Sequence, residues 1–150
     1  MSFYIFVNSD GYDLNDKKVR SKQIALYRIT NKTYPLYKNT RNANSIKKDD
    51  FFIFYLAGSS SVDSKKFIAY GRVESVLTNK NYSEHDVHLS QPIEKVVKLK
   101  SVKSSSSVNI YDVKDKLEFI SQKEKWGSSM QGGVIKIPEK DYNLIIQSFN

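Results

Sequence analysis

The fold of this chain is decided by two runs of sequence. They read Lys47-Lys48-Asp49-Asp50-Phe51-Phe52-Ile53-Phe54-Tyr55-Leu56-Ala57-Gly58 and, after a polar loop, Phe67-Ile68-Ala69-Tyr70-Gly71-Arg72-Val73-Glu74-Ser75. The first run is apolar without interruption from Phe51, which is typical of a strand buried on both faces. The second starts apolar and becomes mixed, and Gly71 stands where a strand can bulge or bend. Together they predict the core hairpin of a small closed β-barrel, a fold that often presents an aromatic pocket at one rim.

Length and composition restrict the class of protein. The chain has 150 residues and no cysteine, so we expect one domain over residues 1–150, without disulfides or thiolate metal sites and suited to the reducing cytoplasm. No apolar run approaches the roughly 20 residues that span a bilayer, and we expect no membrane association. Residues 1–7 lack a basic region and are too short for a signal peptide.

Positive charge is concentrated in one part of the chain. The formal net charge is +8, and the segment from Lys17 to Lys48 holds ten Lys or Arg residues and no Asp or Glu. A segment of one sign is typical of proteins that bind a polyanion such as nucleic acid. The alternative is a Lys-rich surface that serves only solubility.

The remaining pattern predicts about six short strands and two or three helices, an α+β pseudo-barrel. Helices are expected over 21–29, 111–119 and 138–149, with Ser21 capping the first and Ile24, Tyr27 and Ile29 facing the core. A polar loop over 78–85 is expected to be exposed. The further strands are expected at 2–8, 34–37, 93–102 and 134–137.

Catalytic and metal-binding patterns are weak. His85 and His88 share a polar segment without helical periodicity, which favours a solvated loop over a metal site. No Gly-x-Ser-x-Gly elbow is present, and although a Ser-His-acid triad stays open on residue counts, we do not expect an enzyme. Asp112-Val113-Lys114 is a short match to a nuclease motif of a kind that arises by chance. Gly132-Gly133 indicates a turn rather than a phosphate loop, and we expect neither a metal nor another cofactor.

Trp126, the only tryptophan, lies in a polar segment with glycines. Such a residue either covers the core or offers a stacking surface for a base, and a stacked base contributes about 1–3 kcal/mol. Basic neighbours would then attract the phosphates. Tyr34, Tyr37 and Tyr55 lie beside basic residues and either wall a pocket or fill the barrel.

Three blocks of sequence resemble the EVE domain family, one of the PUA-like barrels that also include the YTH and SRA readers of modified bases. The opening Phe3–Asn8 resembles the first strand, with Tyr4 where tryptophan is usual. Lys38-Asn39-Thr40, followed by residues 46–55, resembles the basic-polar loop, the "Lys-x-Gly-Asp" turn with Asp49 for glycine, and the buried strand. The most specific block is the ending, with Leu117-Glu118-Phe119-Ile120, Lys125-Trp126-Gly127, Gln131-Gly132 and Ile137-Pro138-Glu139-Lys140-Asp141-Tyr142 in the family's order.

The resemblance implies a binding module rather than an enzyme. Related readers accept one flipped or unpaired nucleotide in an aromatic cage, where a methyl group adds apolar surface that the rings bury. The partner would be RNA or DNA, with or without a modified base, and a partner enzyme of a defence or modification system is also implied. Carried over to this sequence, the pocket would draw on Asn8, Ser9, Tyr37, Lys38, Asn39, Thr40, Tyr55 and Trp126.

A second hypothesis is a protein-interaction or adaptor domain whose pocket is vestigial. Affinity for nucleic acid falls steeply with salt, whereas an apolar protein interface responds weakly, so salt dependence separates the two hypotheses.

Overall fold

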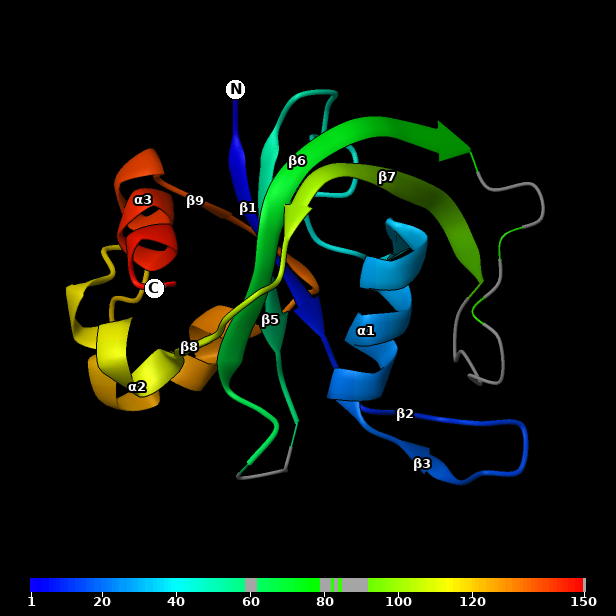
Figure 1. The fold of residues 1–150 in the computed structure, drawn as a ribbon, viewed down its shortest axis with the longest axis horizontal. Coiled ribbons are helices and arrows are strands. Elements are labelled where there is room, and N and C mark those ends of the chain that lie inside the picture. The colour runs from blue at the N-terminus through cyan, green and yellow to red at the C-terminus, as the bar shows by residue number, and fades with distance from the viewer. Residues whose placement is uncertain (59–61, 79–81, 83, 85–91, 150) are drawn as a thin grey trace.

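A curled sheet forms the centre of the molecule (Figure 1). The computed structural model describes residues 1–58, 62–78, 82, 84 and 92–149. The predicted hairpin is confirmed, because β5 pairs antiparallel with β6. Along the sheet the strands follow the order β4 (Thr33–Tyr37), β7 (Ile93–Lys103), β6 (Lys66–Thr78), β5 (Phe51–Leu56), β1 (Phe3–Asn8) and β9 (Val134–Ile137), and the short β8 (Val108–Asn109) pairs with β6.

The two central strands explain why their sequences are apolar throughout. β1 runs parallel to β5 in a register that sets Phe3 beside Phe51 and Asn8 beside Leu56, and β9 pairs antiparallel with the other edge of β1. Residues 4–8 and 52–56 are buried whichever way their side chains point. Both strands are therefore covered on both faces, as the uninterrupted run predicted.

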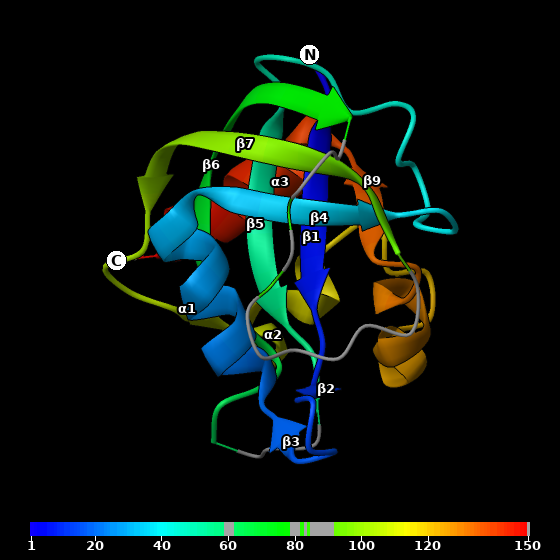
Figure 2. The same cartoon turned by 90° about the vertical axis from the view of Figure 1, so that its right-hand side faces the viewer.

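The sheet is a half-barrel rather than the closed barrel that the hairpin indicated. β6 and β7 bend so that β7 and β4 cross over β1 and β5 (Figure 2). The bend follows a bulge in the β6–β7 register between Tyr70 and Arg72, at Gly71. Among the described strands, β4 and β9 end the sheet without pairing to each other. The Tyr34 hydroxyl spans the gap, donating to the Val7 carbonyl at 2.6 Å and, more weakly, to the Gly133 carbonyl at 3.3 Å. The predicted α+β pseudo-barrel is confirmed in this open form.

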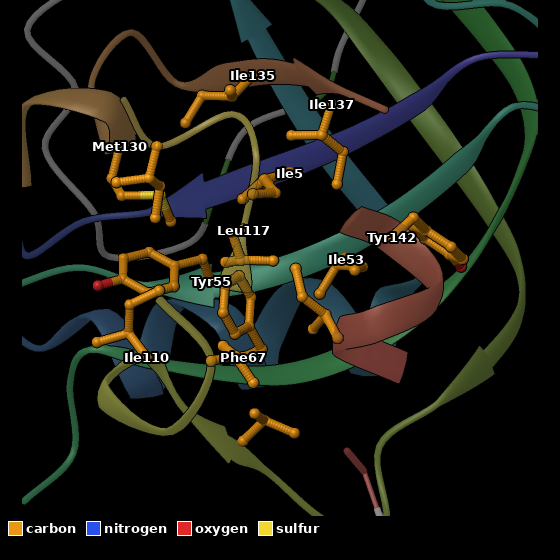
Figure 3. Close-up of a cluster of buried hydrophobic side chains, with 14 of the residues drawn as sticks. Ile5, Ile53, Tyr55, Phe67, Ile110, Leu117, Met130, Ile135, Ile137 and Tyr142 are labelled. Atoms are coloured by element: carbon orange, nitrogen blue, oxygen red, sulfur yellow. The ribbon is translucent and has the colours of Figure 1, made fainter. Parts of the chain in front are cut away.

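One face of β1 and β5 packs against a layer of short helices. Ile5, Ile53 and Tyr55 meet Leu117 and Tyr142 in a buried apolar cluster (Figure 3). The layer consists of α2 (Ile110–Val113), the 3-10 turns η1 (Lys114–Lys116) and η2 (Lys123–Met130), and α3 (Glu139–Gln147).

The other face of these strands fills the inside of the half-barrel. Phe6 stacks on Tyr34 and Phe52 with ring centroids 4.5 and 5.4 Å apart. Helix α1 (Ser21–Asn31) packs against this aromatic interior through Ala25 and Ile29.

Three details of the predicted helices are wrong. Ser21 does not cap α1; it is the first helical residue, and its amide donates to the Asp10 carboxylate at 2.8 Å. Tyr27 is 36% exposed, because the buried face of α1 follows Ser21, Ile24, Ala25 and Arg28. The helix expected over 111–119 stops at Lys116, since Leu117 is extended.

The sequence around Trp126 is not an open loop but the 3-10 segment η2, kinked at Lys125. A separate two-stranded ribbon, β2 (Gly11–Tyr12) with β3 (Lys18–Val19), precedes α1.

Candidate functional site

A cavity of about 390 Å³ opens where β1 and β5 end. Ser9 follows β1, Tyr55 belongs to β5, and Trp126 comes from η2, so three elements distant in sequence each contribute a wall. Ser9 is exposed and Trp126 is half-buried, and Lys65 brings a positive charge to the same cavity. The cavity therefore combines aromatic rings, a hydroxyl and a cation.

Trp126 has features of both roles predicted for it, a cover over the core and a stacking surface for a base. Its ring packs partly against the apolar cluster and meets Tyr111 edge to face, with centroids 5.6 Å apart and planes at 87°. Because the side chain is only half-buried and borders the cavity, part of its ring surface is available to a ligand.

Tyr55 supplies a phenol to the cavity wall. Its ring is 1% exposed and packs with Phe67 at 5.1 Å, while its hydroxyl points out of the cluster (Figure 3). Burial raises the pKa of Tyr55 well above its usual value, with a small contribution from Tyr111. The hydroxyl thus stays protonated at neutral pH and is a hydrogen-bond donor.

Two glycines form the back of the cavity. Gly132 and Gly133 have φ values of 102° and 83°, in the region that favours glycine. The Gly133 carbonyl accepts from the Val7 amide at 2.8 Å, and the Gly132 carbonyl accepts from the Arg41 amide at 3.0 Å. The pair therefore joins β1 to the turn that contains Lys38 and Arg41.

That turn contributes charge at the rim rather than a wall. The Thr40 hydroxyl accepts from the Tyr37 amide at 2.9 Å, and the Thr40 amide donates back to the Tyr37 carbonyl at 3.1 Å. The side chains of Lys38 and Asn39 are exposed. These residues lie next to the glycine pair, outside the lining of the cavity.

Asn8 and Tyr37 belong to a different environment, a buried polar cluster around Arg28. The Arg28 guanidinium donates to both carboxylate oxygens of Glu84, at 2.6 and 2.5 Å, and to Asn8 Oδ1 at 2.9 Å. Asn8 is fully buried and its amide donates to the Phe6 and Tyr55 carbonyls. Asn8 consequently links the cluster to the strands that form the cavity.

Electrostatics in this cluster are strong because water is excluded. Burial by itself lowers the pKa of Arg28, but the hydrogen bond and charge of Glu84 more than offset it, so the pKa is raised overall. Burial raises the pKa of Tyr34 and of Tyr37 beside it, against the opposing charge of Arg28. Arg28 stays charged and both phenols stay neutral.

The sequence did not single out Arg28 or Glu84. Arg28 is one of ten cations in the basic segment, and Glu84 falls in the loop over 78–85 that is expected to be exposed, yet the structure leaves Glu84 only 4% exposed. The available signal was the position of Arg28, seven residues after Ser21 and four after Ile24, on the buried face of α1. The other nine basic residues of the segment are exposed.

The structure thus divides the predicted site residues into three groups. Ser9, Tyr55 and Trp126 share the cavity; the Lys38–Thr40 turn lies at its rim; and Asn8 and Tyr37 lie in the Arg28 cluster. Among the residues the structure describes, no group of three or more His, Asp or Glu side chains is arranged to hold a metal ion. His85 and His88 lie outside the described residues.

A half-barrel with a rim cavity of this kind defines the class of PUA-like domains. Within that class the chain belongs to the EVE domain family, whose model matches residues 7–148. A comparison with curated protein sequences gave no match. In the described part of the chain, every helix is too short or too polar to cross a membrane.

Proposed function

We propose that this protein binds nucleic acid without catalysing a reaction and holds one base, modified or flipped out of a strand, in the cavity between Tyr55 and Trp126. The observation that carries the proposal is the cavity that Ser9, Tyr55 and Trp126 line together. Membership of the EVE family, a PUA-like family, supports the same class of ligand.

The chemistry of the cavity suits a base. Trp126 offers an aromatic surface for stacking, and Tyr55 offers a donor for the edge of the base. The volume of about 390 Å³ lies within the range of small-molecule sites. A methyl group on the base would add apolar surface that the rings can cover, which is how a modification would be distinguished.

The basic side chains around the cavity are suited to binding the phosphate backbone of a nucleic acid. Lys38 and Arg41 are exposed on the turn held against Gly132, and Lys65 borders the cavity itself. Asn8 and Tyr37 would act indirectly, by fixing the ends of β1 and β4 through Arg28, rather than by touching the ligand.

Titration of Trp126 fluorescence with short single-stranded oligonucleotides tests the proposal. Each oligonucleotide is used with and without a methylated cytosine or adenine, as RNA and as DNA, at low and at moderate salt. We expect quenching that is stronger for one modified base and an affinity that falls as salt rises. We also expect Trp126→Ala to weaken binding, measured with a labelled strand, by roughly tenfold or more, the equivalent of one lost stacking contact.

The matched control is Tyr27→Ala, which removes a partly exposed aromatic side chain from α1, away from the cavity. Binding should survive this change, and both variants should keep a cooperative unfolding transition. Absence of any oligonucleotide binding at low salt would overturn the proposal and leave the adaptor hypothesis, with a protein partner, in its place.

A further inference from the structure

A second and larger cavity lies at the opposite end of the same strands. Its volume is about 550 Å³, and Phe3 and Phe51, at the starts of β1 and β5, form part of its wall. Tyr142 and Ile146 of α3 form the facing wall. The apolar cluster of Figure 3 lies between this cavity and the one beside Trp126, so the two cavities are separate.

The walls of this cavity are aromatic and rigid. Phe3 and Phe51 stack with centroids 4.8 Å apart and planes at 11°. The Tyr142 ring lies 5.1 Å from Phe3 and 5.5 Å from Phe51. These three rings support one another, and the volume they border is large enough for a ligand the size of a nucleotide.

Cations gather at one side of the cavity. Arg72 Cζ lies 4.4 Å from the centroid of the Phe51 ring, and Arg72 Nη2 donates to the Asp49 carbonyl at 2.8 Å. Lys103 lines the same side and, among the described residues, makes no ion pair. Of the lining residues, Glu139 alone carries a carboxylate, so the cavity has one more cation than anion.

Two hydrogen-bond donors at this cavity have no partner in the described part of the chain. Arg72 Nε is buried and unsatisfied, and among the described side chains it is the one buried polar atom in this condition. Tyr142 is 3% exposed as a residue, but its hydroxyl keeps some exposed surface and points away from the apolar cluster (Figure 3). A buried donor without a partner in a native protein calls for an explanation, such as an absent ion or ligand.

We propose that this cavity is a second binding site, for a ligand that joins a planar aromatic ring to a phosphate or carboxylate group. The anionic group lies beside Tyr142, Arg72 and Lys103, where it accepts hydrogen bonds from the phenol and the cations. The ring lies against the apolar wall of Phe3 and Ile146. The positive charge on this side of the cavity favours an anionic group. The apolar walls favour a ligand that also carries a ring over a bare inorganic ion.

Burial supports the role of Tyr142 as a donor. It raises the pKa of Tyr142 well above the usual value, and the neighbouring Tyr70 raises it further while Arg72 opposes this. A neutral phenol donates to an anion, whereas a phenolate would repel it.

The test uses adenosine monophosphate, adenosine and inorganic phosphate as probes in calorimetric titrations of the full chain. We expect adenosine monophosphate to bind at least about tenfold more tightly than either of its parts, because both the ring and the phosphate contribute. Tyr142→Phe keeps the ring and removes the hydroxyl, and should weaken binding by roughly tenfold, the usual loss of a hydrogen bond to a charged group. Lys103→Gln should weaken it as well and make it less sensitive to salt.

Controls separate this site from the one beside Trp126. Trp126→Ala should leave the affinity for adenosine monophosphate unchanged, so this proposal stands or falls independently of the proposed base pocket. A pair of oligonucleotides with and without a 5′-phosphate distinguishes a free nucleotide from a strand end as the source of the ligand. Equal affinity for adenosine and adenosine monophosphate, or binding that Tyr142→Phe leaves intact, would overturn the assignment.

Discussion

Arg28 is a charged side chain that lies in the interior of the protein and contributes to the stability of the fold. It is 6% exposed, and its partner Glu84 comes from a segment 56 residues away. The fork of its guanidinium matches both carboxylate oxygens and leaves Nη1 for Asn8. A buried pair of this kind is costly to break, because one charge is left without a partner in a dry interior.

We expect Glu84→Gln to lower the free energy of unfolding by about 3–5 kcal/mol, the range for removing one partner of a buried ion pair. Urea denaturation followed by circular dichroism measures this. The double variant Arg28→Met/Glu84→Gln should recover part of the loss, since it removes the stranded charge. The control is Lys22→Gln, which breaks the exposed 3.2 Å pair with Asp63 and should cost less than about 1 kcal/mol. If Glu84→Gln cost no more than the control, Arg28 would have to reach water when its partner is lost.

At the scale of elements, the bend of β6 depends on one glycine. A Cβ atom at Gly71 would lie 2.8 Å from the Lys100 carbonyl oxygen and 3.0 Å from both Phe52 Cε1 and the Ser101 carbonyl oxygen. These are backbone atoms of β7 and a packed ring, which have little room to move. The close approach of β6 to β7 at the bulge therefore requires the absence of a side chain.

Gly71→Ala should consequently lower the free energy of unfolding by about 1–3 kcal/mol, the usual cost of overpacking. Gly127→Ala is the matched control, since a Cβ there would meet no atom within 4 Å. Chemical denaturation of both variants side by side checks the difference. Equal effects would mean that β7 moves away from β6 without loss.

Patterns within a few residues of each other predicted the elements well, and contacts between distant segments were missed. The strand at 134–137 and the start of the last helix after Pro138 follow from local sequence and are confirmed. The helix predicted over 111–119 fails because the Asp141 carboxylate of α3 accepts from the Glu118 and Phe119 amides, at 2.9 and 2.8 Å, and holds these two residues in a turn. No sequence pattern within residues 111–119 predicts this contact, because its acceptor, Asp141, lies outside that stretch.

The candidate site shows the same contrast between what sequence patterns predict and what contacts between distant segments determine. The resemblance to a family selected Ser9, Tyr55 and Trp126, which line one cavity, but the partnership of Arg28 with Glu84 depends on two segments far apart in sequence. Asp49, where the family pattern has glycine, has a φ of 72°, in the region that favours glycine. Its carboxylate pairs with Lys100 at 2.5 Å, a contact between segments far apart in sequence that the sequence did not predict.

For the molecule as a whole, buried phenols set a limit on stability in alkaline solution. Burial raises the pKa of five tyrosines: Tyr34, Tyr37, Tyr55, Tyr82 and Tyr142. In the unfolded chain these groups lose their protons near pH 10, whereas the folded chain retains them. The unfolded state then binds fewer protons than the folded state, so the free energy of unfolding decreases as pH rises above about 10.

We therefore expect full stability below about pH 10 and a progressive loss above it. Urea denaturation at a series of alkaline pH values measures the loss, and the absorbance of tyrosinate should appear together with unfolding. Tyr142→Phe removes one of these five phenols and should make the loss less steep. Ionisation of these tyrosines in a chain that stays folded and equally stable would contradict the expectation.

The position of β1 between β5 and β9 has a consequence for synthesis on the ribosome. β1 is made well before β9, which contributes its pairing partners from residues 134–137. The nascent chain can form the β5–β6 hairpin early, while one edge of β1 stays open until residues 134–137 have emerged. Contacts of such high sequence separation slow folding. An open apolar strand during that interval is prone to aggregation and is a surface that chaperones would bind.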